Sequence, residues 1–316
     1  MSILKIFILF FLFLSIYSCN QSDNSTTETT GKDKFSGTIS ISGAFALYPL
    51  AVKWSEEFQK LHPDVRIDIS AGGAGKGITD ALSGMVDLGM VSREISKEET
   101  DKGAWKIAVA KDAVLPTVNN KNPIINQLKE KGFTKDEFIN IFINGEITKW
   151  RDNSKMNIYT RSDACGAAEM WGKFLDKNQE SLLGIGVFGD PGIADAIKND
   201  ISGIGYNNIG YIYDITSGLP YEGITVLPVD INANGKIDSE ENFYSSLKEI
   251  LTAIKNNNYP SPPSRDLYFV SNGKPANIIV IEFLNWILTD GQKYVDASGY
   301  VQFTEEKIKS ELEKLK

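Results

Sequence analysis

Much of the chemistry of common active sites is missing from this sequence. Its 316 residues include a single histidine, His62, and only two cysteines, Cys19 and Cys165. One histidine leaves almost no basis for histidine acid–base catalysis, and two cysteines are too few for a disulfide framework or a cysteine zinc site. Basic residues are also in the minority, because 33 Lys and Arg against 41 Asp and Glu give a formal net charge of −8. Nucleic-acid-binding proteins usually carry a basic surface, so we expect no nucleic-acid partner.

Long hydrophobic runs are missing too, apart from one near the N-terminus. Lys5 precedes the apolar stretch Ile6–Ile16, and Cys19 follows closely. The stretch is shorter than the roughly 20 residues of a transmembrane helix. A basic start, a short apolar stretch and a small residue before the cut are typical of a secretory signal peptide, here predicted as residues 1–18.

The segment Ile16–Cys19 resembles the lipobox of bacterial lipoproteins, in which the cysteine is lipidated and becomes the first residue. We therefore expect a lipid on Cys19 and an extracytoplasmic protein anchored to a bacterial membrane, in the periplasm or cell envelope. A plain secreted protein or an uncleaved anchor is the alternative. Residues 20–34 contain no apolar side chain, so residues 19–34 are predicted to form a flexible tether.

From Phe35 onward, short apolar strands alternate with amphipathic helices, which is typical of an α/β architecture. We predict two lobes, with the long apolar stretch 107–118 and a return near 205–214 as the two strands that cross between them. The expected boundaries are 35–117 with 215–316 for the first lobe and 118–214 for the second. A single doubly wound domain is the alternative, although chains of this size usually divide into two domains.

Five short motifs follow one another along this body. They are Gly43–Leu50 (GAFALYPL), Gly72–Ile78 (GGAGKGI), Val86–Arg93 (VDLGMVSR), Ile141–Trp150 (IFINGEITKW) and Arg161–Ala167 (RSDACGA). In this order they resemble the PstS family of phosphate-binding proteins that serve ABC transporters. The resemblance implies a type II periplasmic-binding-protein clamp, each lobe a central sheet flanked by helices, joined by a two-strand hinge. It further implies a monomeric receptor for a small anion, with phosphate favoured, and an ABC permease as the membrane partner.

The resemblance also implies which residues bind the anion. Most of them lie where loops lead into helices, and free N–H groups with the helix dipole favour an anion there. The implied ligand-binding residues are Ala46, Leu47, Ala74, Gly75, Ser92, Arg161, Asp163, Cys165, Gly166 and Ala167. Asp163 is expected to orient Arg161. Replacing Arg161 with alanine is expected to abolish anion binding and to leave the fold intact.

This chain lacks the hydroxyl groups that the family usually has at four of these positions. Ala46 and Ala167 stand in place of Thr, and Ala74 and Cys165 stand in place of Ser. The ligand is therefore left open between phosphate, a larger anion, and a soft metal or metalloid. The clamp could also act as a surface binding module without a permease. Lys76, in the glycine-rich loop, could supply a replacement cation.

Cys165 begins a predicted helix close to Arg161 in the sequence, so we expect its thiol to have a lowered pKa. The pair resembles a phosphatase loop only loosely, because that chemistry needs the cysteine before the arginine in one phosphate-binding loop. Here the arginine comes first and no histidine is near. An enzyme is therefore not expected.

A second candidate site lies at residues 230–241 (DINANGKIDSEE), which match the twelve-residue calcium loop of an EF-hand. Gly235 stands where that loop turns sharply. The expected calcium ligands are Asp230, Asn232, Asn234, Lys236 through its carbonyl, Asp238 and Glu241. Because no partner loop follows or precedes it, we predict a lone, weak, structural calcium site in the first lobe, in preference to a calcium-gated sensor.

Overall fold

The computed structural model describes residues 35–316. The predicted signal peptide 1–18, the lipidation site Cys19 and the tether 19–34 therefore lie outside the described residues. Over residues 35–316, no helix combines the length and the apolar character needed to cross a membrane.

Strands and helices alternate along the described chain, as the sequence predicts. The strands are β1 (Gly37–Gly43), β2 (Val65–Ala71), β3 (Leu88–Val91), β4 (Ala104–Val118), β5 (Phe133–Thr134), β6 (Asn157–Arg161), β7 (Ile185–Val187), β8 (Gly203–Asn208), β9 (Thr225–Val226), β10 (Val229–Asp230) and β11 (Ser264–Asn272). The helices are α1 (Tyr48–Leu61), α2 (Ala74–Leu82), α3 (Lys97–Asp101), α4 (Ile125–Lys131), α5 (Lys135–Phe142), α6 (Gly166–Phe174), α7 (Gly189–Asn199), α8 (Leu247–Lys255), α9 (Ile278–Leu288) and α10 (Glu305–Glu313).

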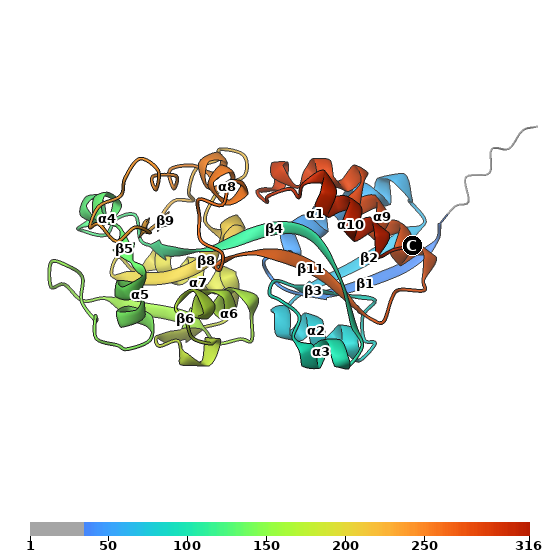
Figure 1. Ribbon diagram of the computed structural model, residues 1–316, viewed down its shortest axis with the longest axis horizontal. Coiled ribbons are helices and arrows are strands. Elements are labelled where there is room, and N and C mark those ends of the chain that lie inside the picture. Colours follow the sequence, from blue (N-terminus) through green and yellow to red (C-terminus); the bar gives the residue numbers. More distant parts are fainter. Residues whose placement is uncertain (1–34) are drawn as a thin grey trace, which may run out of the picture. The chain divides into compact units, whose positions relative to one another are not determined.

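One mixed sheet runs through both lobes, in the order β2-β1-β3-β11-β4-β8-β6-β7. β1 pairs in parallel with β2 and β3, whereas β11 inserts antiparallel between β3 and β4. The long β4 pairs with β11 over its first part and with β8 over its last part. Figure 1 shows β4 and β11 passing between the lobes side by side.

The crossing strands are therefore β4 and β11. The predicted crossing at 107–118 lies within β4. The predicted return at 205–214 is wrong, because β8 pairs with β6 inside the second lobe. Both stretches are largely buried, so local pattern alone does not tell a crossing strand from a strand that stays in its lobe.

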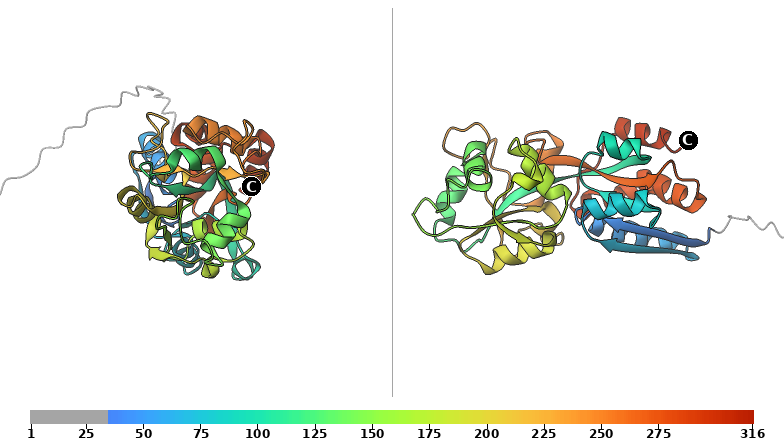
Figure 2. Two further views of the ribbon diagram at one scale, coloured as in Figure 1. Left: turned by 90° about the vertical axis from the view of Figure 1, so that its left-hand side faces the viewer. Right: turned by 90° about the horizontal axis from the view of Figure 1, so that it is seen from below.

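Each lobe has a hydrophobic core of its own. In the first lobe, α1 and α9 bring Trp54, Phe58 and Phe283 against the sheet residue Phe269. Figures 1 and 2 show the C-terminal helices α9 and α10 in the first lobe, where α9 lies against β1 although the two are far apart in the sequence. In the second lobe, α5, α6 and β8 contribute an aromatic cluster of Phe138, Phe142, Trp171 and Tyr206. Two separate cores explain why the body has two lobes.

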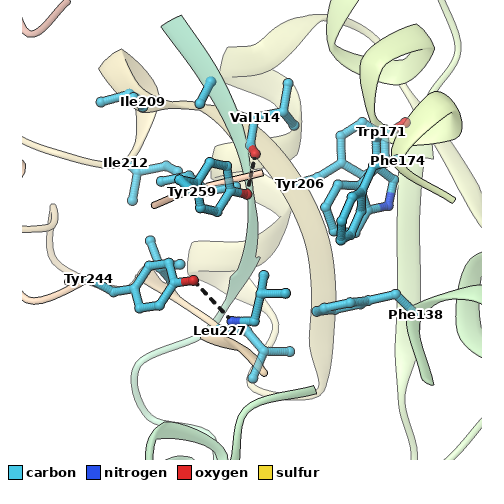
Figure 3. Packing of buried hydrophobic residues seen from close by; sticks show 14 of the residues in the cluster. Val114, Phe138, Trp171, Phe174, Tyr206, Ile209, Ile212, Leu227, Tyr244 and Tyr259 are labelled. Carbon is cyan, nitrogen blue, oxygen red and sulfur yellow. Dashed lines mark hydrogen bonds between the residues drawn. The ribbon is translucent and has the colours of Figure 1, made fainter. Parts of the chain in front are cut away.

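Residues 226–259 belong to the second core, which corrects the predicted boundary at 215. Figure 3 shows Tyr244 and Tyr259 packed in this core, and the Tyr259 hydroxyl donates to the Val114 carbonyl at 2.7 Å. β10 also pairs with β5 of the second lobe. The chain returns to the first lobe only at β11, so the calcium loop 230–241 lies on the second lobe and not on the first. Long-range packing decides which core a segment joins. The pattern of polar and apolar residues within the segment does not predict this.

Candidate functional site

The loop between β1 and α1 carries the predicted residues Ala46 and Leu47, and both are buried. Two tyrosine hydroxyls hold the carbonyl groups of this loop. Tyr300 donates to the carbonyl of Ala46 at 2.8 Å, and Tyr211, from the second lobe, donates to the carbonyl of Phe45 at 3.1 Å. The N–H groups of Phe45 and Ala46 form no hydrogen bond with any residue of the described part. The loop therefore offers two donors at the point where the lobes meet.

The glycine-rich loop before α2 touches the second lobe directly. Gly75 donates its N–H to the carbonyl of Ala164 at 3.1 Å. Gly73 has a φ of 91°, and a Cβ atom there would lie 2.9 Å from a carboxylate oxygen of Asp163. Both the backbone conformation and the close approach therefore require glycine at this position. Ala74, the first residue of α2, is fully buried.

Lys76 does not serve as the replacement cation in this structure. Its ammonium group pairs with Asp80, one turn further along α2, and 44% of its side chain is exposed. The same Asp80 carboxylate accepts the hydroxyl of Ser42 at 2.7 Å. The lysine charge is therefore matched by a carboxylate on its own helix.

Arg161 ends β6 and is the buried cation of the site, with 5% of its surface exposed. Its Nε and Nη2 donate to the two carboxylate oxygens of Asp163 at 2.8 and 2.6 Å, the arrangement that the family resemblance implies. Its Nη1 donates to Asp190 at 2.5 Å. Burial disfavours the charge, but the two carboxylates keep the pKa of Arg161 above its ordinary value. Two N–H groups, one on each Nη, remain available to a ligand.

Asp190 is the part of this site that the sequence does not reveal. It lies in the first turn of α7, is 1% exposed, and accepts the N–H of Asn208 at 3.1 Å. An aspartate in the first turn is favoured by the helix dipole, so its sequence position has an ordinary structural explanation. Only the fold places it against Arg161, which lies 29 residues earlier in the chain.

Cys165 is the N-cap of α6, where its sulfur accepts the N–H of Ala168 at 3.4 Å. The expected lowering of its pKa is wrong. Burial raises the pKa of the thiol to about 12, and the nearby Arg161 guanidinium offsets only part of this. The N–H groups of Gly166 and Ala167 form no hydrogen bond with residues 35–316. The start of α6 therefore offers two donors, while the cysteine stays a neutral, buried cap.

The start of α6 lies directly against Ser92 of the first lobe. A Cβ atom on Gly166 would lie 2.2 Å from the Ser92 hydroxyl oxygen and 2.3 Å from its carbonyl oxygen. Next to this contact, Arg93 Nε and Glu169 Oε2 form an ion pair at 2.9 Å between the lobes. The lobes are thus closed on each other. Their closure brings together the predicted loops around Ala46, Gly75, Ser92 and Arg161, and the role of these residues in binding stays a prediction.

The calcium loop has its carboxylates turned toward its own N–H groups. Asp230 accepts the N–H of Gly235 at 2.8 Å, and Glu241 accepts the N–H groups of Ile231 and Asn232, both at 2.9 Å. Asp238 is partly exposed, and the ammonium of Lys236 and the side-chain amides of Asn234 and Asn232 lower its pKa to about 2. Within residues 35–316, no three His, Cys, Asp or Glu side chains are arranged to hold a metal ion. Calcium binding therefore stays a prediction from the loop sequence.

Comparison with known proteins places this fold in a family. Residues 24–291 match the PBP superfamily domain. The phosphate-binding protein PstS of Bacillus subtilis is 27% identical over 67% of this chain and 69% of its own length. That of Staphylococcus aureus is 23% identical over 91% of this chain and 85% of its own length. Phosphate-binding protein PstS 2 of Streptococcus agalactiae is 36% identical, and this match spans only 38% of this chain and 39% of the relative.

Solved structures agree with the two-lobed α/β fold. A Clostridium perfringens protein with bound phosphate has a TM-score of 0.69 at 21% identity, over 85% of this chain and all 100% of that one. An ABC-type phosphate transport receptor from Vibrio cholerae has a TM-score of 0.60 at 17% identity, over 84% of this chain and 100% of that one. The predicted clamp architecture is therefore confirmed. The chain belongs to the PBP superfamily, as a PstS-like member.

Proposed function

We propose that this protein is an extracytoplasmic receptor that captures phosphate or a related oxyanion between its lobes and delivers it to an ABC permease. The observation that carries the proposal is the Arg161 guanidinium, which is buried between the lobes with two N–H groups unengaged. Around it lie helix-start loops whose N–H groups have no partner among the described residues. Guanidinium groups and free N–H groups at helix starts are the donors that oxyanions prefer.

The missing hydroxyl groups set the expected affinity. Ala46, Ala74, Cys165 and Ala167 cannot donate as Thr and Ser would, so backbone N–H groups and Arg161 must supply the hydrogen bonds. A hydrogen bond to a charged group contributes roughly 1.5–3 kcal/mol, so the four losses are large unless other groups replace them. Phosphate is favoured because the relatives of this chain are phosphate-binding proteins. A clamp adapted to another ligand, or used without a permease, is the alternative.

The same proposal places the protein on the outer side of a membrane through a lipid on Cys19. It rests on the lipobox resemblance of residues 16–19 and on the polar tether that follows. Replacing Cys19 with serine should release the protein from the membrane fraction and abolish incorporation of labelled palmitate. Retention of Cys19→Ser in the membrane fraction would contradict the anchor and leave the binding function open.

We also propose that the loop 230–241 binds calcium in a structural role. Asp230 and Glu241, the first and last ligands of the pattern, are both nearly buried, at 2% and 5% exposure. Their carboxylates now bond N–H groups of the loop, which keeps the loop folded tightly around its centre. Ligands of this kind in a single loop favour weak affinity, in the millimolar to submillimolar range of extracellular calcium sites.

The binding function can be tested with a substitution that hinders closure of the two lobes. Gly166→Ala introduces a methyl group that overlaps Ser92 only when the lobes are closed. Gly210→Ala is the matched control, because no heavy atom lies within 4 Å of its added Cβ. Calorimetry with phosphate, on protein stripped of bound anions, should show one-to-one binding by the wild type and by Gly210→Ala. Gly166→Ala should bind at least about tenfold more weakly, a loss of 1.4 kcal/mol, while melting at a similar temperature.

Two results would overturn the proposal. If Gly166→Ala binds phosphate as tightly as the wild type, the ligand does not lie where the lobes meet at α6. If the wild type gives no heat up to millimolar phosphate, the clamp serves another ligand. Mass spectrometry of the small molecules that co-purify would then identify the class of that ligand.

A further inference from the structure

One aromatic side chain of the first lobe reaches across the anion cleft to the second lobe. Phe45 lies in the loop between β1 and α1, and its side chain is half-buried. Its ring meets the ring of Phe188, the N-cap of α7, edge to face, with the ring centroids 5.9 Å apart. A Cβ atom on Gly189 would lie 3.1 Å from Cζ of Phe45. The ring is therefore seated against second-lobe residues, and opening of the clamp would break these contacts.

The Phe45 ring also lies against the buried cation of the site. The guanidinium carbon of Arg161 is 5.5 Å from the ring centroid, over the face of the ring. A cation in this position is attracted to the aromatic face, and the attraction is stronger away from water. Arg161 is at the same time held by Asp163 and Asp190. Because these carboxylates fix the guanidinium, the ring that covers it has a fixed place as well.

The backbone of Phe45 brings this ring next to the ligand. The Phe45 N–H has no partner among residues 35–316 and is one of the donors that the proposed function assigns to the anion. The carbonyl of the same residue accepts the Tyr211 hydroxyl of the second lobe at 3.1 Å, which holds the loop in place. An anion bound by both the Phe45 N–H and Arg161 lies beside the ring, because the ring belongs to one donor and contacts the other.

Exposure increases outward along these contacts. Arg161 is 5% exposed, Phe45 is half-buried, and Phe188 is 62% exposed. The rings of Phe45 and Phe188 therefore form an aromatic wall between the anion cleft and the solvent. Edge-to-face rings with centroids about 4.5–7 Å apart are in contact, so this wall leaves no room between its two rings for a further group.

The side chains at several predicted binding positions are much smaller. Ala46, Ala74 and Ala167 each carry a single methyl group. Phe45 therefore adds far more bulk to the cleft than these neighbours do. Extra atoms in a packed site cost free energy, because the groups around them must shift. A ligand with an organic substituent directed at the aromatic wall would have to displace the Phe45 ring, and with it the contacts that hold the lobes together.

We propose that Phe45, backed by Phe188, is a specificity-determining residue: its ring excludes oxyanions that carry an organic substituent and restricts the clamp to a compact, unsubstituted oxyanion. This inference rests on the proposed function and specifies the substrate class of the same site. The ring and the donors of the cleft have different roles. Arg161 and the free N–H groups attract any oxyanion, whereas the aromatic wall rejects those that are too large.

The experiment compares inorganic phosphate with phenyl phosphate by calorimetry at pH 8, where both are mainly dianions. The proteins are the wild type, Phe45→Ala, Phe188→Ala and Phe303→Ala, all stripped of bound anions. Phe303 is the matched control, because its ring is also half-buried and also contacts a cation, with the Lys307 ammonium 5.6 Å from the ring centroid, but it packs on the core of the first lobe. Melting curves check that each variant is folded.

We expect the wild type to prefer phosphate over phenyl phosphate by at least about a hundredfold. Phe45→Ala leaves a space of the size of one ring beside the anion, which the phenyl group can fill. It should therefore bind phenyl phosphate at least about tenfold more tightly than the wild type does, a gain that damage to the fold cannot produce. Phe188→Ala, which removes only the outer ring, should show a smaller gain, and Phe303→Ala should show none.

Three results would overturn the role of Phe45 and leave the proposed function standing. They are a wild type that binds phenyl phosphate as tightly as phosphate, a folded Phe45→Ala that gains no affinity for phenyl phosphate, and an equal gain in Phe303→Ala. Phe188 is largely exposed, so its variant keeps the fold and decides the question if Phe45→Ala does not fold. A wild type that binds neither anion would overturn the proposed function as well.

Discussion

Replacing Arg161 with alanine should destabilise the whole fold. The sequence alone predicts an intact fold for this variant, because it does not show that Arg161 is buried between two carboxylates. The Arg161 side chain is 1% exposed and holds two carboxylates, of which Asp163 is 8% and Asp190 1% exposed. Removing the cation leaves both carboxylates buried without their main partner. Breaking a buried ion pair by deleting one partner typically costs about 3–5 kcal/mol. For a chain of this size that corresponds to a melting temperature lower by roughly 6–20 °C.

Thermal unfolding followed by circular dichroism tests this, with the double variant Arg161→Met, Asp190→Asn as the control. Removing charge on both sides restores the balance in part, so the double variant should melt closer to the wild type than Arg161→Met does. If Arg161→Ala melts within about 2 °C of the wild type, the buried network does not contribute as argued. Loss of anion binding by Arg161→Ala is informative only at temperatures where the variant is shown to be folded.

Three further outcomes follow from contacts described above. Glu169→Gln removes the ion pair with Arg93 between the lobes and should weaken phosphate binding by up to about fivefold in calorimetry, with little change in melting temperature; unchanged affinity would mean that the pair does not favour closure. Cys165 should react with a thiol reagent at pH 8 roughly a thousandfold more slowly than an ordinary cysteine, because burial raises its pKa to about 12; fast labelling of the folded protein would contradict this. Two millimolar calcium should stabilise the wild type and Glu240→Gln by about 1 kcal/mol, but not Glu241→Gln, and equal melting shifts in all three would exclude the loop as the site.

The sequence predicts the secondary structure and the loops of this site well. The start of α5 illustrates the local part, because Thr134 and Glu137 form the reciprocal capping pair that their spacing predicts. The motif residue Gly75 contacts Ala164, and Ser92 contacts Gly166, although these motifs come from different parts of the chain. Motifs of this kind can be predicted from the sequence, because each depends on the local geometry of a short stretch of chain.

Features that depend on contacts between distant parts of the chain cannot be predicted from local sequence patterns. The sequence predicts the second crossing strand at 205–214, whereas the structure has it in β11, because the crossing is decided by the strands with which each stretch pairs. The sequence also predicts a lowered pKa for Cys165, because a helix start and a nearby arginine are visible in the sequence whereas burial is not. Asp190 gains its importance only from the Arg161 guanidinium that the fold places beside it.

The insertion of β11 between β3 and β4 has a consequence for the order in which the chain can fold during synthesis and export. Apart from Val301, all buried residues of the second core lie in the contiguous stretch 113–259, so most of this lobe can fold as soon as that stretch is available. The first lobe cannot complete its sheet before residues 264–272 arrive, and Trp54 then bonds the carbonyl of Gly291, 237 residues away. Contacts of such long range form slowly, and until they form, the edges of β3 and β4 are exposed to pairing with other chains. The N-terminal strands of the first lobe therefore stay incompletely paired until the C-terminal part of the chain has been made.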